Sequence, residues 1–285
     1  MSLRPNTPHA VGDAGTLEAL AHVLRSLDRV VVAFSGGADS ALLAKVATDT
    51  LGRERVLCAT AQSASLAPEE LEDTKTLASE WGLRHVTPRT SELDNPDYVR
   101  NDLDRCFHCK SELMAVLGPL AAAESATVVL GVNLDDLGEH RPGQAAAAEQ
   151  GARFPLVEAG FTKALVRRHS EALGLRTFDK PAAACLASRL PHGTSVTSSR
   201  LEQIARAESG LRSLGFAQLR VRHHDQSARI EVPLEDLVAV VERREAVVET
   251  LKAAGYRYVT LDLEGFRSGN LALAALQREA GAAGT

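Results

Sequence analysis

The chain has 285 residues, of which 45% are hydrophobic and 24% are charged, and its net charge is -5 with a pI near 6.0. This composition is typical of a globular protein with one large or two ordinary domains. The acidic balance argues against bulk binding of nucleic acid and favours a small anionic substrate. No stretch is apolar over the roughly 20 residues of a membrane span, and the N-terminal residues lack the apolar core of a signal peptide, so we expect a cytoplasmic protein without a membrane partner.

The first half of the chain alternates helix patterns with strand patterns. Leu and Val recur at helical spacing over residues 16–27, and a wholly apolar, β-branched run follows at 29–34, as expected of a strand buried on both faces. The same reasoning predicts helices over 40–51, after Pro68 and over 109–123, and strands at 55–61, 85–88 and 128–133. This βαβα alternation predicts an α/β fold in which helices cover a parallel sheet.

After Asp179 the sequence changes to a loop and then to a second α/β pattern. Ser199, with Glu202 three positions later, resembles a capping box and predicts a helix through about Leu214. The elements predicted after it are alternating strands at 218–224 and 228–233, a helix over 234–254 and a strand at 256–264. We therefore predict a first domain over 1–185 and a smaller C-terminal α/β domain over 186–285.

The segment SGGADS, residues 35–40, lies between the first predicted strand and the helix after it. Glycines let successive backbone N–H groups face one anion, and the helix N-terminus adds partial positive charge, so a phosphate site is the interpretation preferred over a simple Gly-rich turn. The segment lacks the G-K-[ST] ending of the common NTPase loop. It resembles the pyrophosphate-grip loop (PP-loop) of ATP pyrophosphatases, S-G-G-x-D-S. That resemblance implies a Rossmann-like open sheet, ATP cleaved between its α and β phosphates with Mg²⁺ present, and ATP-binding residues Ser35, Gly36, Gly37, Asp39 and Ser40.

The segment RCFHCK places two of the four cysteines, Cys106 and Cys109, in a C-x-x-C pair. In a reducing compartment such a pair favours a metal site or catalysis over a structural disulfide. A zinc site that uses His192 and a redox couple both remain open. Cys185 lies in a loop without hydrophobic periodicity, where a reactive thiolate is the favoured interpretation, whereas Cys58 in an apolar strand is expected to be a small buried hydrophobic residue.

Several separated segments resemble the LarE family, the ATP-dependent sulfur transferases of nickel-pincer cofactor synthesis. These segments are GVNLDD (131–136), RPGQAAAAEQGARFPL (141–156), KPAAACLASRLPHG (180–193) and LDLEGFRSGN (261–270). The resemblance implies that ATP adenylates the carboxylates of pyridinium-3,5-biscarboxylic acid mononucleotide and that sulfur then replaces the activated oxygen, giving thiocarboxylates. It also implies a homo-oligomer such as a hexamer, a C-terminal domain that binds substrate and supports assembly, and partners among other nickel-pincer proteins.

Two sources of the transferred sulfur follow from this resemblance. In the first, Cys185 attacks the adenylate, forms a thioester and loses its own sulfur, leaving dehydroalanine. In the second, three cysteines hold a [4Fe–4S] cluster whose open iron carries an extra sulfide. The cluster hypothesis is favoured here, with Cys106, Cys109 and Cys185 as its ligands, because the sacrificial route leaves Cys106 and Cys109 without a role.

Alternation within LRVRHH and RIEV predicts that Arg220, Arg222, Arg229 and Glu231 share one face if the two strands pair. An ordinary solvated polar face is the plain alternative. The planar guanidinium group suits phosphate recognition, and the resemblance implies that Arg220 and Arg222 contact the substrate phosphate. It also assigns a divalent cation to Glu208 and Glu231.

Two other functions fit parts of the sequence. One is a PP-loop tRNA thiolase or amidotransferase, although no RNA-binding module is recognisable. The other is a nucleotide- or metal-binding regulator that keeps the loop without turnover. Asp135 and Asp136, which follow a predicted strand, are candidates either for the nucleotide site or for a helix cap. Pyrophosphate release that depends on the carboxylated pyridinium nucleotide separates an enzyme from a regulator.

Overall fold

The structure is a computed structural model that describes residues 13–138, 142–181 and 184–267. The N-terminal residues considered above for a signal peptide lie outside these ranges, as do the last three residues of the segment 261–270. Among the described residues, no helix has both the length and the apolar character needed to cross a membrane.

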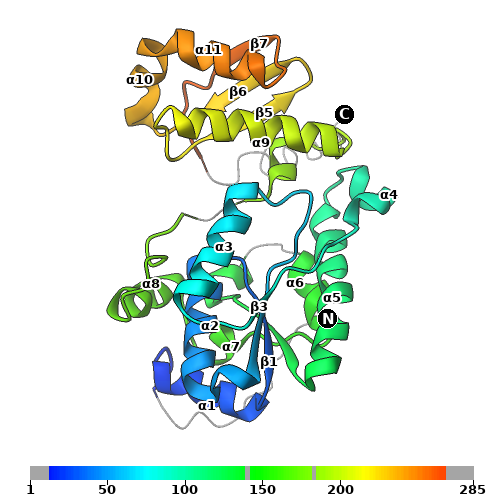
Figure 1. The fold of residues 1–285 in the computed structure, drawn as a ribbon, viewed down its shortest axis with the longest axis vertical. Coiled ribbons are helices and arrows are strands. Elements are labelled where there is room, and N and C mark those ends of the chain that lie inside the picture. The colour runs from blue at the N-terminus through cyan, green and yellow to red at the C-terminus, as the bar shows by residue number, and fades with distance from the viewer. Residues whose placement is uncertain (1–12, 139–141, 182–183, 268–285) are drawn as a thin grey trace, which may run out of the picture. The chain divides into compact units, whose positions relative to one another are not determined.

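The chain folds into two compact units (Figure 1). The first unit contains the described parts of Met1–Ser63, Glu69–Thr90 and Cys109–Ala183. The second unit contains those of Ala64–Pro68, Ser91–His108 and Ala184–Thr285. Two short segments from the first half of the chain are therefore grouped with the C-terminal residues. A functional boundary between residues 185 and 186 stays a prediction.

The first unit contains a four-stranded parallel sheet with strand order β3-β2-β1-β4. Its strands are β1 (Val30–Ala33), β2 (Val56–Ala59), β3 (His85–Val86) and β4 (Thr127–Leu130). Val31 of β1 pairs with Leu57 on one side and Val128 on the other. The predicted α/β fold with a Rossmann-like open parallel sheet is confirmed. The strand order reverses between β1 and β4, and ligands of such sheets bind beyond the carboxyl ends of the strands at this switch point.

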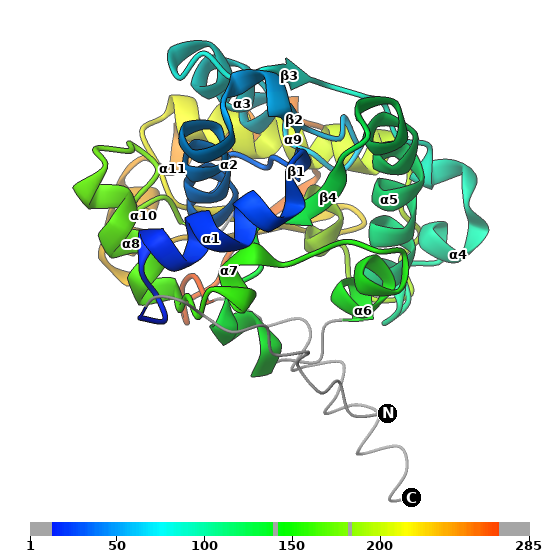
Figure 2. The ribbon, with the colours of Figure 1, turned by 90° about the horizontal axis from the view of Figure 1, so that it is seen from below.

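Helices cover both faces of this sheet because its strands are apolar on both faces. The helices that pack on one face are α1 (Leu17–Leu27), α2 (Ala38–Leu51), α3 (Pro68–Glu80) and α8 (Lys163–Ala172). On the other face lie α5 (Arg105–Glu124) and α6 (Pro142–Glu149). Figure 2 shows the strands between α2 and α5. The short elements are η1 (Arg53–Arg55), η2 (Glu92–Asp94), α4 (Pro96–Val99), η3 (Leu134–Gly138), α7 (Pro155–Glu158) and η4 (Leu186–Arg189).

The C-terminal part of the second unit is a three-stranded sheet with helices. The strands β5 (Arg220–His224) and β6 (Ser227–Glu231) do pair, as an antiparallel hairpin, and β7 (Tyr258–Leu261) pairs in parallel with β6. The accompanying elements are α9 (Ser198–Ser213), η5 (Leu234–Asp236), α10 (Leu237–Glu242) and α11 (Arg244–Ala253). Val221, Ile230 and Leu251 are buried in the core that these elements share.

Several predicted boundaries were wrong. The single helix expected over 234–254 is divided into η5, α10 and α11. The cap of α9 is Thr197, whose hydroxyl accepts from the Arg200 N–H, and not Ser199. α5 begins at Arg105 rather than near Cys109, so the C-x-x-C pair lies in its first turns. The helices α6, α7 and α8 were not predicted.

Candidate functional site

The PP-loop lies at the carboxyl end of β1, where its serines hold it in shape. The Ser40 hydroxyl accepts from the Ser35 N–H at 3.2 Å and donates to the Gly37 carbonyl at 3.2 Å. Gly36 has φ +70°, a left-handed conformation that favours glycine, and Gly37 is the N-cap of α2. The loop therefore leads directly into a helix N-terminus, which is a suitable end for binding an anion.

The end of β4 approaches this loop very closely. A Cβ atom on Gly131 would lie 2.7 Å from the Ser40 backbone nitrogen and 3.0 Å from the Asp39 carbonyl carbon. Such distances to backbone atoms exclude a side chain, so glycine is required for β4 and α2 to approach at this point. The switch point predicted from the strand order thus contains the loop itself.

Asp39 accepts from two side chains that sequence reasoning missed. Its carboxylate accepts from Asn133 Nδ2 at 2.9 Å and from Lys163 Nζ at 2.5 Å. Asn133 is buried and follows β4, whereas Lys163 begins α8 and is 124 positions from Asp39 in the sequence. GVN after a strand gave a weak signal for Asn133, but no local pattern indicated Lys163.

Asp135 and Asp136 bond to nearby backbone groups. The Asp136 carboxylate accepts from the Asn133 N–H at 3.1 Å, and the Asp135 carboxylate accepts from the Lys163 N–H at 2.6 Å. These bonds favour the capping interpretation of the two residues. They also fix the backbone of Asn133 and Lys163, whose side chains hold Asp39.

In the second unit, Cys106 and Cys185 both lie near the buried guanidinium of Arg105. Burial acts to lower the pKa of Arg105, but the Cys185 and Cys106 thiols act in the opposite direction and the pKa is raised overall. Arg105 donates to Asn101 Oδ1 at 2.5 Å and to the Ala187 carbonyl at 2.9 Å. It thereby joins the start of α5 to the residues that follow Cys185.

Asn101 strengthens the same connection. Its amide donates to the carbonyls of Pro191 and Thr194 at 2.8 and 2.9 Å, and its own carbonyl accepts from the Gly193 N–H. Asn101 is fully buried with φ +60°, a left-handed conformation that asparagine tolerates better than most residues. Asn101 and Arg105 were not singled out in the sequence, because no motif marks a residue that acts by holding another loop.

The third predicted cluster ligand, Cys109, belongs to the first unit. It follows Cys106 by three positions on α5, a spacing that places side chains on neighbouring parts of a helix surface. His108 Nε2 lies 3.2 Å from the Asp104 carboxylate. Among the described residues no group of three His, Cys, Asp or Glu side chains is arranged to hold a metal ion. The three-cysteine cluster site stays a prediction.

Cys58 differs from the other thiols, as predicted. It is 1% exposed in β2, and burial raises its pKa to about 12, whereas Cys106 and Cys185 are exposed. Since the thiolate is the reactive form, we expect iodoacetamide at pH 8 to modify Cys106 and Cys185 in the native, iron-free protein and to modify Cys58 only after unfolding. Mass spectrometry of the peptides measures this order. Equal labelling rates for Cys58 and Cys185 would contradict it.

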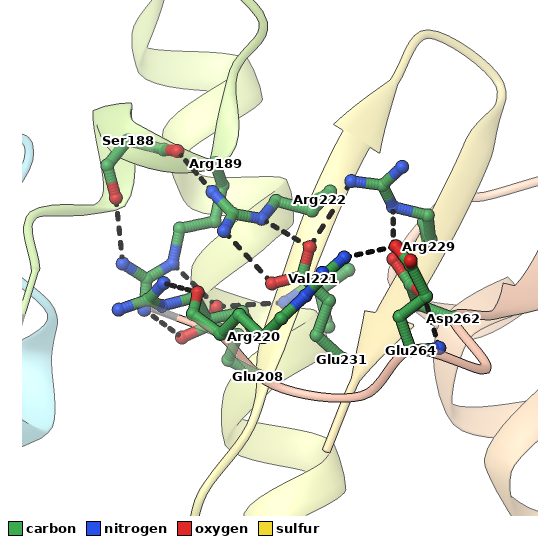
Figure 3. A network of polar contacts seen from close by, with 11 residues as sticks. Ser188, Arg189, Glu208, Arg220, Val221, Arg222, Arg229, Glu231, Asp262 and Glu264 are labelled. Carbon is green, nitrogen blue, oxygen red and sulfur yellow. Dashed lines mark hydrogen bonds and ion pairs between the residues drawn. The ribbon is translucent and has the colours of Figure 1, made fainter. Parts of the chain in front are cut away.

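A buried network of arginines and carboxylates lies beside β5 and β6 (Figure 3). Arg222 donates through two nitrogens to both oxygens of Glu231, each at 2.9 Å. Arg189 makes a similar two-bond contact with Glu208, at 2.8 and 3.1 Å. Both glutamates are fully buried and Arg222 is 2% exposed, so the solvated polar face considered above is wrong for these residues.

Arg220 has different contacts within this network. Its guanidinium donates to the Arg267 carbonyl and lies over the Phe266 ring, 4.4 Å from the ring centroid. Burial lowers its pKa, and the nearby charges of Arg222 and Arg189 add to the effect. Glu231 and Glu208 act in the opposite direction but only partly offset these effects, so this buried guanidinium is a suitable partner for an anion.

Both glutamates predicted as cation ligands are already engaged by arginine. Glu208 also accepts from Arg212 and from the Val221 N–H, and Glu231 also accepts from Arg229. A cation at either carboxylate would have to replace these donors. We therefore derive no step through a metal ion there.

Comparison with known proteins gives one family match and three relatives. Residues 19–99 match the NAD synthase family. The chain is 47% identical over 258 residues to the uncharacterized protein slr1717 of Synechocystis, covering 90% of this chain and 96% of that protein. It is 40% identical over 254 residues to pyridinium-3,5-bisthiocarboxylic acid mononucleotide synthase of Lactiplantibacillus plantarum, covering 88% and 92%. It is 25% identical over 241 residues to the uncharacterized protein MJ0830 of Methanocaldococcus jannaschii, covering 84% and 91%.

Proposed function

Because the chain belongs to the LarE family of PP-loop sulfur transferases, we propose that it converts the carboxylates of pyridinium-3,5-biscarboxylic acid mononucleotide to thiocarboxylates. The observation that supports this proposal most directly is the 40% identity, over nearly the whole length, to a relative named for the bisthiocarboxylic product. The loop after β1 and the thiols beside Arg105 supply groups suited to the two half-reactions.

The first half-reaction is adenylation at the PP-loop. A substrate carboxylate oxygen attacks the α-phosphorus of ATP, the bond to the bridging oxygen breaks, and pyrophosphate leaves. This step replaces a poor leaving group on the carbonyl carbon with AMP. Residues 35–40 and the N-terminus of α2 would hold the phosphates, as their backbone conformation suggests.

Mg²⁺ is expected with ATP, and Asp39 fits a role in holding it. Magnesium is usually bound through one or two carboxylates together with substrate phosphates, so a single carboxylate beside the loop is a suitable donor set. Asn133 and Lys163 each donate to a different oxygen of the Asp39 carboxylate, which leaves each oxygen a second lone pair for an ion. Glu208 and Glu231 differ because they already accept four and three bonds. When bound, the ion would neutralise phosphate charge and aid departure of pyrophosphate.

The arginine network is proposed to bind the phosphate of the mononucleotide. Four arginines of the network, Arg189, Arg212, Arg222 and Arg229, make ion pairs with three carboxylates, those of Glu208, Glu231 and Asp262. Arg220 adds a further positive charge. This excess of cations supports a phosphate contact for Arg220. The predicted contact of Arg222 would be made through the guanidinium N–H groups that Glu231 and the Ser188 carbonyl leave open.

The second half-reaction delivers sulfur, and we propose that Cys185 is required for it. Sulfur attacks the carbonyl carbon of the adenylate and AMP leaves. The proximity of Cys106 and Cys185 to one guanidinium supports a shared role for the two thiols. A cluster held by Cys106, Cys109 and Cys185 would supply a terminal sulfide. In the alternative, Cys185 forms a thioester and its Cβ–S bond then breaks with loss of the Cα proton.

Pyrophosphate release tests the first half-reaction. We expect release from ATP and Mg²⁺ only when the biscarboxylated nucleotide is present, and a decrease of roughly a hundredfold or more in Asp39→Asn, which removes the proposed metal ligand's charge. A coupled phosphate assay after pyrophosphatase treatment measures both. Release that depends on tRNA instead would favour a tRNA thiolase, and no release from the folded protein would favour a regulator.

A further inference from the structure

We infer that Lys180 binds the β and γ phosphates of ATP at the PP-loop and neutralises the departing pyrophosphate. This inference deepens the proposed function and rests on ATP being bound at residues 35–40. Lys180 lies at the end of the first unit and was not among the predicted site residues.

The inference rests on the position of the Lys180 ammonium near the loop. A Cβ atom built on Gly36 would lie 3.9 Å from Lys180 Nζ. The same Cβ would lie 2.9 Å from Thr74 Cγ2 and 3.5 Å from Leu77 Cδ1, so the ammonium is the polar group nearest to Gly36 on a side that α3 otherwise covers. The residues concerned all belong to the first unit, although 144 positions separate Gly36 from Lys180 in the printed sequence.

Two carboxylates of α3 hold the ammonium in this position. Lys180 Nζ donates to Glu70 at 2.8 Å and to Asp73 at 2.7 Å, and its side chain is 18% exposed. Burial acts to lower the pKa of Lys180, but the bonds to Asp73 and Glu70 outweigh it and the pKa is raised. Lys180 is therefore charged at neutral pH.

The reaction needs a cation at this place. The loop lacks the lysine that ends the common NTPase loop, so its backbone supplies only partial charges. Negative charge develops on the β-phosphate as the bond to the α-phosphorus breaks. A lysine is a compact point charge that serves as a phosphate ligand. Lys163 beside the loop is paired with Asp39, and Lys180 would add a second full positive charge on the Gly36 side.

A purely structural ion pair between α3 and residue 180 makes different predictions from a phosphate ligand. A phosphate ligand contacts ATP and pyrophosphate but not AMP, which lacks the β and γ phosphates. An ion pair that only shapes the loop would affect all three ligands, and binding of all three would weaken when either the lysine or one of its two carboxylates is changed.

Calorimetric titration with α,β-methylene-ATP, pyrophosphate and AMP, each with Mg²⁺, tests the inference. Lys180→Met is expected to weaken the first two ligands by roughly tenfold to a hundredfold, the usual effect of losing a hydrogen bond to a charged group, and to leave AMP within about twofold. Lys180→Arg keeps the charge and is expected to recover most of the affinity. The matched control is Lys45→Met on α2, which removes a lysine paired with Asp49 on the helix that follows the loop.

Glu70→Gln distinguishes a phosphate ligand from a structural ion pair, because this variant weakens the ion pair and keeps the ammonium of Lys180. If Lys180 is a phosphate ligand, this variant should bind pyrophosphate more tightly, by up to about fivefold, since one competing carboxylate is removed. A loss in Glu70→Gln as large as that in Lys180→Met would overturn the inference, and so would unchanged pyrophosphate affinity in Lys180→Met. If the wild-type protein binds none of these ligands, the proposed function fails as well.

Discussion

Cys185→Ala is expected to abolish thiocarboxylate formation while leaving substrate-dependent pyrophosphate release intact. Both routes for sulfur use this thiol, as nucleophile or as cluster ligand, whereas adenylation is assigned to the loop after β1 in the other unit. Loss of a nucleophile costs several orders of magnitude in rate, so we expect a decrease of at least about a thousandfold. Mass spectrometry of the nucleotide product and a pyrophosphate assay on the same sample measure the two half-reactions.

Cys185→Ala, compared with the same change at Cys106 and Cys109, also tests the source of the sulfur. Under the cluster hypothesis, anoxically purified wild-type protein contains iron and acid-labile sulfide, and Cys106→Ala, Cys109→Ala and Cys185→Ala each lose them. Under the sacrificial hypothesis only Cys185 is essential. Iron-free wild-type protein that turns over once and converts Cys185 to dehydroalanine would reject the cluster. Loss of ATP binding in folded Cys185→Ala would show that its role was misread.

The parts of the fold predicted from sequence are those that local pattern determines. β1 and β4 are mostly β-branched runs and β2 is wholly apolar, and the loop at 35–40 follows β1. Of the missed helices, α6 lacks such a signal. Alanine dominates α6, so no apolar stripe stands out, and the division of 234–254 falls at two adjacent arginines, Arg243 and Arg244, which have no strong tendency to end a helix.

Site residues were predicted only where residues with a shared role lie next to one another in the sequence. The loop residues and the C-x-x-C pair are short motifs that can be read directly. Lys163, Lys180 and Arg105 reach their positions through tertiary packing, because their partners lie far away in the sequence or on another loop. A lone lysine or arginine has the same local pattern whether it is solvated or holds a carboxylate. Contacts of this kind require the structure.

Burial of the hairpin arginines is the clearest case of this limit. Alternation correctly placed Arg220 and Arg222 on the face opposite Val221. Whether that face is solvated depends on η4 and α9, which supply Ser188, Arg189 and Glu208 to the network (Figure 3). The sequence pattern predicts α9, but it does not indicate that η4 and α9 pack against these strands. This burial makes the network sensitive to the loss of one charge.

Glu231→Ala is expected to lower the free energy of unfolding by about 3–5 kcal/mol, because it leaves the buried guanidinium of Arg222 without its carboxylate. Urea denaturation followed by circular dichroism measures the change. The control is Glu245→Ala, which removes an exposed carboxylate paired with Arg244 and is expected to change stability by less than about 0.5 kcal/mol. A loss below about 1 kcal/mol in Glu231→Ala would show that the remaining groups rearrange around Arg222.

The double variant Arg222→Met with Glu231→Leu separates stability from substrate binding. Replacing both members of a buried ion pair by apolar residues is often neutral for stability, so the double variant is expected to recover most of the loss seen in Glu231→Ala. It does not restore a guanidinium beside Arg220, and we therefore expect mononucleotide affinity to remain at least about tenfold weaker than in the wild-type protein. Wild-type affinity in the stable double variant would show that Arg222 holds the sheet and not the phosphate.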